Sequence, residues 1–465
     1  MKRRAWIEAL ERAVAGVEAW EGRWPGDHVP ERTAAADGAL AELVSRLSDN
    51  YPFFHPRYAG QMLKPPHPVA WTAYATAMLI NPNNHALDGG PATAAMEREV
   101  VAELAGMLGY ATDPEGHLGH LTGGGTMANL EALWICRELA PGKRIAYSEA
   151  AHTTHARMCG VLGVEGVAVP VDARGRMDLE ALGRELERGD IGAVVATPGT
   201  TGLGALDPVE SIVSLARRHG ARVHVDAAYG GFFALLATRE PPLVDAAPFR
   251  AIADADSVVI DPHKHGLQPY GCGCVLFRDP DVARFYVHDS PYTYFTSSER
   301  HLGEISLECS RPGAAAAALW ATFRAIELAP ERGLGEMLAA GRRAALALAD
   351  RLAASENLAL LTDPETDIAV FAPAPRAGVR ASELSRQSEA MLARGIEKGD
   401  RGVYIATFTA ERSLVERAWP NASIDWDRDT LTVLRSVLMK PEHESFAPDL
   451  AEAFEALAAD AIDLV

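Results

Sequence analysis

Alternating strand-like and helical segments constrain this chain more than any other feature. Seven short apolar runs recur between residues 116 and 277, and helical patterns such as 127–140 and 208–220 separate many of them. Strands that alternate with helices form mostly parallel sheets with both faces covered. We therefore predict an α/β fold with a mostly parallel seven-stranded sheet covered by helices. The runs are GHLGHLT (116–122), RIAYS (144–148), GVAVPV (166–171), AVVAT (193–197), RVHVD (222–226), SVVID (257–261) and GCVLF (273–277).

Changes in sequence texture divide the chain into three parts. Residues 1–65 begin with an amphipathic helix and lead into an aromatic, proline-rich stretch, which lacks a clear period and is expected to be irregular. Residues 66–330 carry the alternating pattern. A long alanine-rich helix at 334–354 then opens a second series of strands and helices, so 331–465 is predicted to be a smaller C-terminal α/β domain.

Polar residues follow the predicted strands at the points where they end. Gly123 to Thr126 lie between the first run and a helix, and His152, Thr201, Asp226 and Lys264 each lie at or just beyond the end of a later run. Ligands of open α/β sheets bind outside the carboxyl ends of the strands. We expect these residues to meet at one rim of the sheet.

Each of these residues alone has an ordinary structural explanation. The glycine-rich turn suits a phosphate at a helix N-terminus, but it lacks the Walker lysine and equally fits a tight turn. Asp226 alone suits a helix cap, His152 a structural histidine, and Lys264 a solvated surface lysine. Together they suit pyridoxal 5′-phosphate, because a lysine forms a Schiff base with the aldehyde, a carboxylate pairs with the pyridine nitrogen and an imidazole stacks on the ring.

The charge and cysteine content exclude other classes of function. The chain has 44 basic and 63 acidic residues, a net charge of −19, which disfavours nucleic acid as a partner. No apolar run is long enough to span a membrane. The five cysteines match no zinc pattern, so we expect no metal, and their number indicates a reducing, cytoplasmic location.

Six stretches of the chain resemble the group II pyridoxal-phosphate-dependent amino-acid decarboxylases, a fold type I family that includes the glutamate, aromatic amino acid, diaminobutyrate and tyrosine/aspartate enzymes. The resemblance implies the transferase-like fold of that type, with pyridoxal 5′-phosphate as cofactor and release of CO2 from an L-amino acid to give its amine. The stretches are HLTGGGTMANLEALW (120–134), YSEAAHTTHA (147–156), ATPGTTGLGALDPV (196–209), HVDAAYGGF (224–232), DPHKHG (261–266) and LECSRPGAAAAALW (307–320).

The resemblance also implies roles for single residues at the cofactor. Lys264 is the implied Schiff-base lysine, His152 the ring-stacking histidine and Asp226 the partner of the pyridine nitrogen. The remaining implied cofactor contacts are Gly125, Thr126 and His263 near the phosphate, Thr201 near the ring or its 3′-oxygen, and Ala228 beneath the ring.

The substrate residues are implied in the same way. Arg311 matches the arginine that meets the substrate α-carboxylate in similar glutamate decarboxylases, and Gln61 matches a substrate-contacting glutamine. His85 lies in a segment that resembles one reaching across a dimer in this fold, where it would read the substrate side chain or serve as a turn residue. A homodimer with its active site at the subunit interface is implied.

The proton that returns to the α-carbon has several candidate donors. Tyr292 and Tyr294 lie on a polar stretch comparable to a mobile loop that supplies a tyrosine in several relatives. His152 and a residue of the second subunit are the alternatives.

Other reactions and functions stay open at this point. The segment SRPGA (310–314) resembles sphingosine-phosphate lyases, which break a carbon–carbon bond with the same cofactor, and an aldehyde-forming decarboxylating variant uses the same fold. A non-enzymatic phosphate-binding protein would need neither Lys264 nor Asp226. A nucleotide-dependent oxidoreductase would need a dinucleotide fingerprint, which we do not find.

Overall fold

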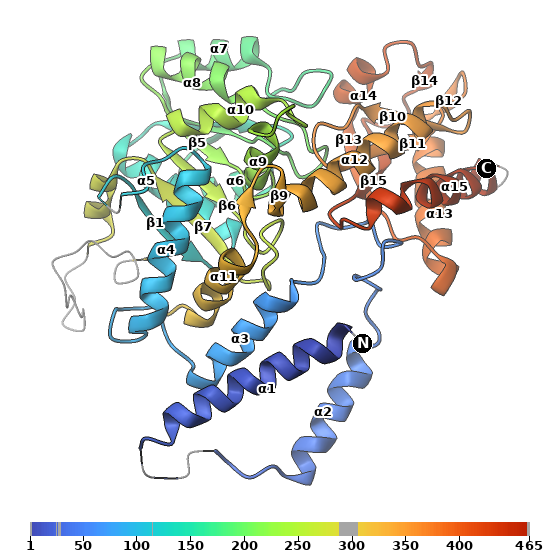
Figure 1. Ribbon diagram of the computed structural model, residues 1–465. Helices are drawn as coiled ribbons and strands as arrows, with labels where there is room; N and C mark the ends of the chain where they lie inside the picture. Colours follow the sequence, from blue (N-terminus) through green and yellow to red (C-terminus); the bar gives the residue numbers. More distant parts are fainter. Residues whose placement is uncertain (1, 25, 27–28, 114, 288–305, 463–465) are drawn as a thin grey trace.

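The computed structural model describes residues 2–24, 26, 29–113, 115–287 and 306–462 (Figure 1). Two β-sheets with their covering helices form the upper part of the molecule in that view, and helices α1 (Lys2–Glu21), α2 (Ala34–Leu47) and α3 (Pro68–Ile80) lie below them. Within the described ranges, no helix combines the length and apolar character needed to cross a membrane.

The larger sheet has seven strands in the order β1-β7-β6-β5-β4-β2-β3. Strands β3, β2, β4, β5 and β6 run parallel, whereas β7 is antiparallel to both of its neighbours, β6 and β1. The mostly parallel seven-stranded sheet predicted from the sequence is therefore confirmed. Its strands are β1 (Leu118–Thr122), β2 (Arg144–Ser148), β3 (Gly166–Val169), β4 (Ile191–Ala196), β5 (Arg222–Asp226), β6 (Ser257–Ile260) and β7 (Gly273–Phe277).

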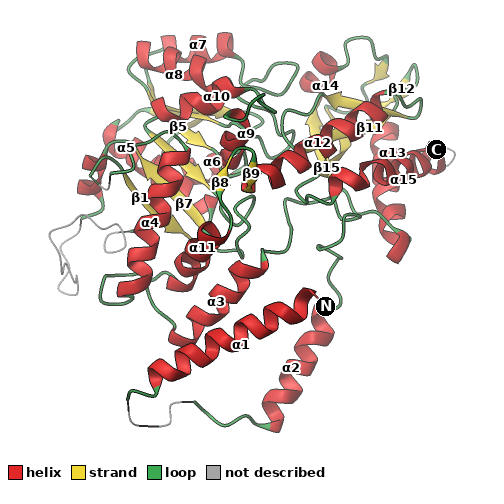
Figure 2. Ribbon diagram, viewed as in Figure 1, coloured by secondary structure: helices red, strands yellow, loops and turns green. Residues whose placement is uncertain are grey.

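Both faces of this sheet are apolar because both are covered by helices (Figure 2). Along β4, Ala193 and Val195 pack with residues of α5 (Gly125–Leu139) and α6 (Thr154–Leu162). Val194 and Ala196 point to the opposite face, since successive strand residues alternate between faces. The helices on that side are α4 (Pro91–Met107), α7 (Leu179–Glu187), α8 (Val209–Arg218), α9 (Ala234–Ala237) and α10 (Ala246–Arg250).

The smaller sheet has four antiparallel strands in the order β10-β11-β15-β13. One face packs on α12 (Leu334–Ala353), α13 (Ala381–Glu397) and α15 (His443–Ile462). The other face joins the same apolar core as the large sheet, through residues such as Val370 and Val433. The strands are β10 (Leu358–Thr362), β11 (Ile368–Pro373), β13 (Ala406–Glu411) and β15 (Thr430–Val437).

Shorter elements complete the described chain. Helix α11 (Gly313–Ala325) packs between α3 and α4, which connects the N-terminal helices to the large sheet. Two pairs of very short strands form separate ribbons, and α14 follows β13. These elements are β8 (Leu328–Ala329), β9 (Arg332–Gly333), β12 (Val379–Arg380), β14 (Ile424–Asp425) and α14 (Arg412–Ala418).

The stretch between α2 and α3 is irregular, as its sequence predicts. It is nevertheless held against the small sheet, because the backbone N–H of Ala59 donates to Tyr404 and the carbonyl of Ala59 accepts from Val437. The N-terminal segment thereby becomes a neighbour of β15. The predicted division of the chain after residues 65 and 330 stays a prediction, although the seven-stranded and the four-stranded sheet each lie entirely on one side of residue 330.

Candidate active site

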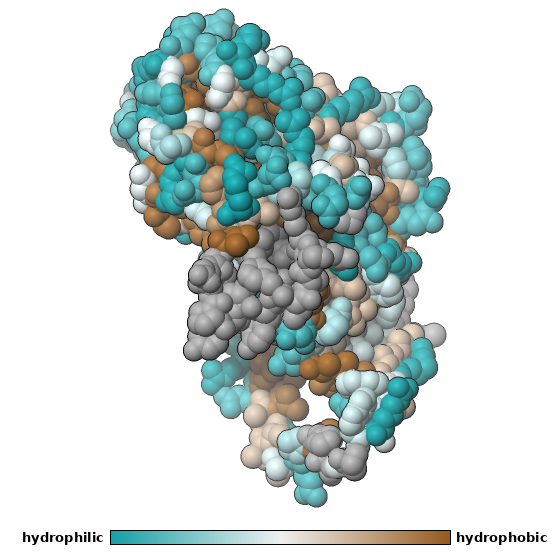
Figure 3. Space-filling view, turned by 90° about the vertical axis from the view of Figure 1, so that its left-hand side faces the viewer, coloured by the Kyte–Doolittle hydropathy of each residue, from teal (hydrophilic) through white to brown (hydrophobic). Residues whose placement is uncertain are grey.

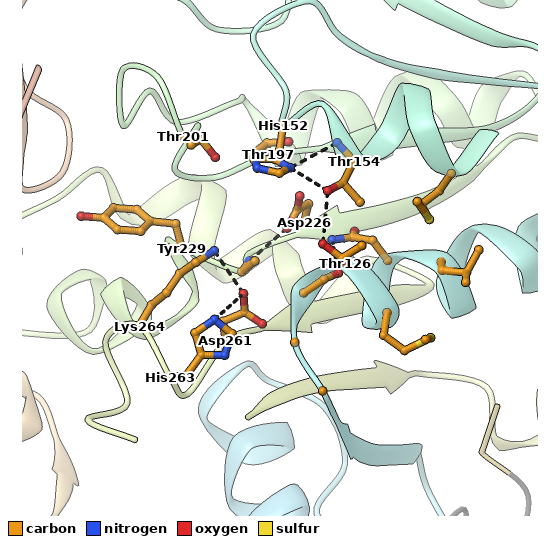
Figure 4. Close-up of a pocket in the computed structure, with 18 of the residues that line it drawn as sticks. Thr126, His152, Thr154, Thr197, Thr201, Asp226, Tyr229, Asp261, His263 and Lys264 are labelled. Carbon is orange, nitrogen blue, oxygen red and sulfur yellow. Dashed lines mark hydrogen bonds and ion pairs between the residues drawn. The ribbon is translucent and has the colours of Figure 1, made fainter. Parts of the chain in front are cut away.

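A cavity of about 710 Å³ opens at the carboxyl ends of the parallel strands (Figure 4). Side chains from the loop before α5, the ends of β4, β5 and β6 and the start of α6 converge on it. The sheet topology thus gathers residues from Gly123 to Lys264 at one edge, as the predicted rim requires. The predicted residues that line the cavity are Gly125, Thr126, His152, Thr201, Asp226, Ala228, His263 and Lys264.

The glycine-rich loop leads into α5 without a side-chain cap at Gly124. The N-terminus of this helix therefore offers backbone N–H groups and a partial positive charge to an anion. A Cβ at Gly125 would lie 2.7 Å from Asp261 Oδ2 and 3.2 Å from the Cβ of Ala228, so only glycine fits there. One anionic group already uses the loop, since Gly123 N–H donates to Glu308 Oε2 at 2.7 Å.

Lys264 reaches the cavity wall from the connection after β6. Its Nζ lies 3.1 Å from Asp261 Oδ2, and its side chain keeps 20% of its surface exposed. His263 Nε2 lies 3.6 Å from the same carboxylate oxygen, while its Nδ1 bonds to the carbonyl of Cys272 at 2.8 Å. Asp261 thus holds the amine of Lys264 at the cavity in Figure 4.

Asp226 ends β5 with both carboxylate oxygens bonded. Oδ2 lies 2.8 Å from Nε2 of His155, and Oδ1 accepts from the backbone N–H of Ala228 at 3.1 Å. Burial alone would raise the pKa of Asp226, but the hydrogen bond from His155 and the charge of Lys264 lower it well below its usual value. Asp226 is therefore a buried, ionised carboxylate at the cavity wall.

His152 is oriented by the start of α6. Its Nδ1 accepts the backbone N–H of Thr154 at 3.2 Å and lies 2.7 Å from the hydroxyl of the same residue. An accepting Nδ1 places the proton of the neutral ring on Nε2. Burial, followed by the charge of Lys264, lowers the pKa of His152, against the opposing effect of Asp226, so the ring is neutral near pH 7.

Arg311 does not line the cavity among the described residues. Its guanidinium is buried, forms an ion pair with Glu97 and donates to the carbonyls of Leu121 and Asn84, each at 2.9 Å. This partnering departs from the expectation that Arg311 meets the substrate carboxylate. The charge of a guanidinium that pairs with a buried carboxylate is already neutralised within the fold.

Gln61 has a different basic partner. Its Oε1 accepts from Nη2 of Arg435 at 2.9 Å, and Nη1 of Arg435 donates to the carbonyl of Thr201, a cavity residue, at 2.7 Å. Arg435 is only 6% exposed, and within the described residues no Asp or Glu forms an ion pair with it.

The other predicted substrate and proton-donor residues are placed elsewhere. His85 lies in the turn before α4, where its ring would meet a Cβ at Gly89 at 2.6 Å, and it does not line the cavity as described. Tyr292 and Tyr294 lie outside the described residues.

Three site residues were not predicted from the sequence. His155 follows His152 by three positions on a helical turn, a spacing that brings side chains to one side and that could have been noticed. Asp261 ends the apolar run 257–261, but the sequence alone predicts no role for it. Arg435 gave no local signal, because its importance depends on contacts with residues more than 200 positions away.

The residues at this cavity fit pyridoxal 5′-phosphate. The uncapped helix with its glycine approach suits the phosphate, and the ionised Asp226 suits a protonated ring nitrogen. Thr197 Oγ1 and Asp261 Oδ1 are buried polar atoms at the wall without a hydrogen-bond partner in the described structure, so the cavity also has unused polar capacity.

Comparison of sequences points to the same chemistry. Residues 66–373 match the model of the pyridoxal-dependent decarboxylase conserved domain. A probable L-tyrosine/L-aspartate decarboxylase of Methanospirillum hungatei is 32% identical over 292 residues, which cover 62% of this chain and 73% of the relative. The L-2,4-diaminobutyrate decarboxylase of Acinetobacter baumannii is 27% identical over 423 residues, covering 79% of this chain and 80% of the relative.

Solved structures share the fold over nearly the whole chain. Mouse CSAD superimposes with a TM-score of 0.76 at 21% identity, covering 98% of this chain and 99% of that one. Oryza sativa TDC, solved with PLP and tryptamine, gives a TM-score of 0.77 at 18% identity and covers 97% of each chain. At these identities the likeness establishes the fold, which confirms the predicted fold type.

Proposed function

This chain belongs to the pyridoxal-dependent decarboxylase family and is a carboxy-lyase that uses pyridoxal 5′-phosphate, and we propose that Lys264 holds that cofactor while an L-amino acid loses CO2. The observation that carries the proposal is the meeting of Lys264, Asp226, His152 and the glycine loop at one cavity. The cofactor, when bound, draws electrons away from the substrate α-carbon.

The side chains of the cavity divide the work of binding. The N-terminus of α5 would hold the phosphate, and the carboxylate of Asp226 would favour a proton on the ring nitrogen. His152 would pack against the ring, and the small side chain of Ala228 would leave room for it. Lys264 would hold the cofactor through its amine, which Asp261 keeps at the cavity wall.

Arg435 replaces Arg311 in our proposal as the group that binds the substrate carboxylate. A buried guanidinium without an acidic partner in the described residues is costly unless an anion reaches it. Arg435 already touches Gln61 and the carbonyl of Thr201 at the cavity edge, so a carboxylate there would gain charge-assisted hydrogen bonds. Gln61 would then contact the substrate beside it, as the resemblance implies.

Several groups are candidates for returning the proton to the substrate α-carbon. Nε2 of His152 carries a proton at the cavity wall and is one source, while Tyr292, Tyr294 and a group of a second subunit remain the other candidates. The relatives are named for tyrosine, aspartate and diaminobutyrate, and these three amino acids are the first substrates to test.

We also propose that the enzyme is a cytoplasmic homodimer. Helix α2 has no buried residue, and it exposes Leu40, Leu43, Val44 and Leu47 on neighbouring turns. Apolar side chains gather in the lower part of the face in Figure 3, where the N-terminal helices lie. A second copy that covers such a surface would remove it from water. Light scattering that gives a monomer at micromolar concentration would contradict this proposal.

The experiment combines cofactor attachment with product identification. Borohydride reduction of the holoenzyme should leave one pyridoxyl phosphate on the peptide that contains Lys264, as read by mass spectrometry. Lys264→Ala should lose this adduct and all measurable turnover, whereas Lys398→Ala, at an exposed lysine far from the cavity, should keep both. Attachment at another lysine would overturn the assignment.

Product analysis then separates the related reactions. Release of CO2 with one amine per substrate supports decarboxylation. An aldehyde with ammonia and oxygen consumption would indicate the oxidative variant, and an aldehyde without CO2 would indicate a carbon–carbon lyase.

A further inference from the structure

His155 is a buried histidine whose contacts differ from those of its neighbour His224. Both rings are fully buried near the end of β5. His224 bonds to neutral groups, with Nε2 2.8 Å from Asn129 Oδ1 and Nδ1 2.8 Å from Ser257 Oγ. His155 instead contacts the carboxylate of Asp226. One histidine therefore braces the sheet, and the other acts directly on a cavity residue.

The geometry fixes the direction of the carboxylate. Nε2 of His155 lies 2.8 Å from Oδ2 of Asp226, while the backbone N–H of Ala228 holds Oδ1 at 3.1 Å. The two donors come from different elements, α6 and the turn after β5. A carboxylate bonded at both oxygens cannot rotate without breaking one of these bonds, so its remaining lone pairs keep their orientation toward the cavity.

The environment of His155 also fixes its proton. Nδ1 is buried and has no hydrogen-bond partner in the described structure, so a proton there would be a buried, unsatisfied donor. The proton therefore lies on Nε2 and points at Asp226. Tyr147 of β2 stacks on the ring, with centroids 6.2 Å apart and planes 30° apart, which limits rotation of the imidazole.

We propose that His155 is a positioning residue that keeps the carboxylate of Asp226 aimed at the ring nitrogen of pyridoxal 5′-phosphate, and that it thereby sets the strength of cofactor binding. The inference rests on the proposed role of Asp226 in the cofactor site. His155 acts through the carboxylate and does not line the cavity among the described residues.

The other titratable groups that face Asp226 come from each element around it. Lys264 lies on the connection after β6, His224 on β5 itself and His152 at the start of α6. Asp261 faces Lys264 and also acts on His152. In the described structure none of these side chains has a hydrogen bond to the carboxylate of Asp226, whereas His155 does. Removal of His155 should therefore change the carboxylate more than removal of any of them.

The test measures the dissociation constant of pyridoxal 5′-phosphate for apoenzyme prepared from each variant. His155→Phe keeps the stacked ring but removes the donor, and the constant should rise by about 10-fold or more. His155→Gln retains an N–H donor and should recover most of the affinity. Tyr147→Phe is the matched control, since it preserves the stack and leaves the hydrogen bond to Asp226 in place.

The pH dependence of binding provides a second measurement. Cofactor affinity should fall on acidification as Asp226 takes up a proton, and without the donor of His155 this fall should occur about one pH unit higher for each tenfold loss of stabilisation. His155→Phe should therefore shift the acid limb upward, and Tyr147→Phe should not. An unshifted limb together with an unchanged dissociation constant would overturn the inference.

A double-mutant cycle separates a role through Asp226 from simple packing. In an Asp226→Asn background, His155→Phe should change the dissociation constant less than about twofold. The same tenfold loss in that background would show that His155 acts only by packing. If His155→Phe does not fold by circular dichroism, His155→Asn, whose shorter side chain cannot reach Oδ2, replaces it.

Different results would contradict the proposed function and the role of His155. Wild-type apoenzyme that does not bind the cofactor would contradict the proposed function. Wild-type binding that is matched by His155→Phe would contradict only the role of His155.

Discussion

The rim of the seven-stranded sheet and the corner formed by Gln61 and Arg435 are assembled in different ways. At the rim, Asp226 and Lys264 follow successive strands, so the parallel topology alone brings them to one edge. At the corner, Gln61 and Arg435 are 374 positions apart and meet because the irregular N-terminal segment lies along the small sheet. A site built on strand order can be recognised in a sequence, whereas one built on packing between distant segments cannot.

The largest expected effect tests the rim. Asp226→Asn keeps the size of the side chain but removes the charge that favours a protonated ring nitrogen, so kcat should fall by about 10⁴-fold, or roughly 5 kcal/mol. Steady-state kinetics with saturating cofactor measures this. A loss smaller than about tenfold would mean that Asp226 braces the fold instead of acting on the cofactor.

The second prediction concerns Arg311, which lies neither at the rim of the sheet nor at the corner formed by Gln61 and Arg435. Arg311→Met leaves the buried carboxylate of Glu97 without its partner, and the free energy of unfolding should fall by about 3–5 kcal/mol. Urea denaturation measures the loss, and adding Glu97→Gln should recover part of it. Unchanged stability with a raised KM would instead restore the substrate role that the resemblance implies.

A substitution at the corner formed by Gln61 and Arg435 should weaken substrate binding. Arg435→Met removes the proposed carboxylate partner, and KM should rise by about 10- to 100-fold, equivalent to about 1.4–3 kcal/mol. Arg435→Lys keeps the charge but loses the paired N–H groups, so it should be intermediate. Initial rates at varied substrate concentration give both values. If kcat alone falls, the guanidinium orients Thr201 and does not bind substrate.

The last prediction is a pH dependence of stability behind the same corner. Lys440 donates to the carbonyl of Tyr58 at 2.6 Å, and burial, with a further effect of Lys64, lowers its pKa to about 7. Above pH 7 the unfolded chain then binds more protons at this group than the folded chain does, so stability should increase with pH up to about pH 10. The slope is at most about 1.4 kcal/mol per pH unit.

Lys440→Met provides the comparison for that slope. Urea denaturation at pH 7, 8 and 9 should show a flatter dependence in the variant than in the wild type. Equal slopes would mean that Lys440 keeps its proton in the folded state.

The sequence predicted most of the fold because apolar runs and helical periods report burial directly. Strands β2, β5 and β7 were predicted with the bounds that the structure has for them, or within one residue of these. Helices α2 and α3 were not predicted, since α2 buries no residue.

For the site, the sequence predicted the residues that follow strands and not those that packing between distant segments brings in. Lys264, Asp226 and His152 could be placed because each follows a recognisable strand. The spacing of His155 from His152 could have placed it near the site, but its role depends on which atom its ring nitrogen contacts. Arg435 could not be placed, because its role depends on contacts with distant residues. Arg311 was placed by resemblance at the substrate, yet its partner Glu97 is decided by packing of α4 against the segment before α11.

The reversed direction of β7 has a consequence for how this enzyme can vary. Since β7 starts at the edge where β6 ends, the twelve residues from Asp261 to Cys272 leave and re-enter the sheet on the same side. A Cβ at Gly273 would lie 2.7 Å from the backbone of Gly124, so the start of β7 contacts the glycine-rich loop before α5. The segment that carries Lys264 is thus anchored at both ends, and insertions within it would displace the Lys264 amine from the cavity wall. Length changes are better tolerated in the turns at the opposite edge of the sheet, such as the one between α5 and β2, because these turns do not line the cavity among the described residues.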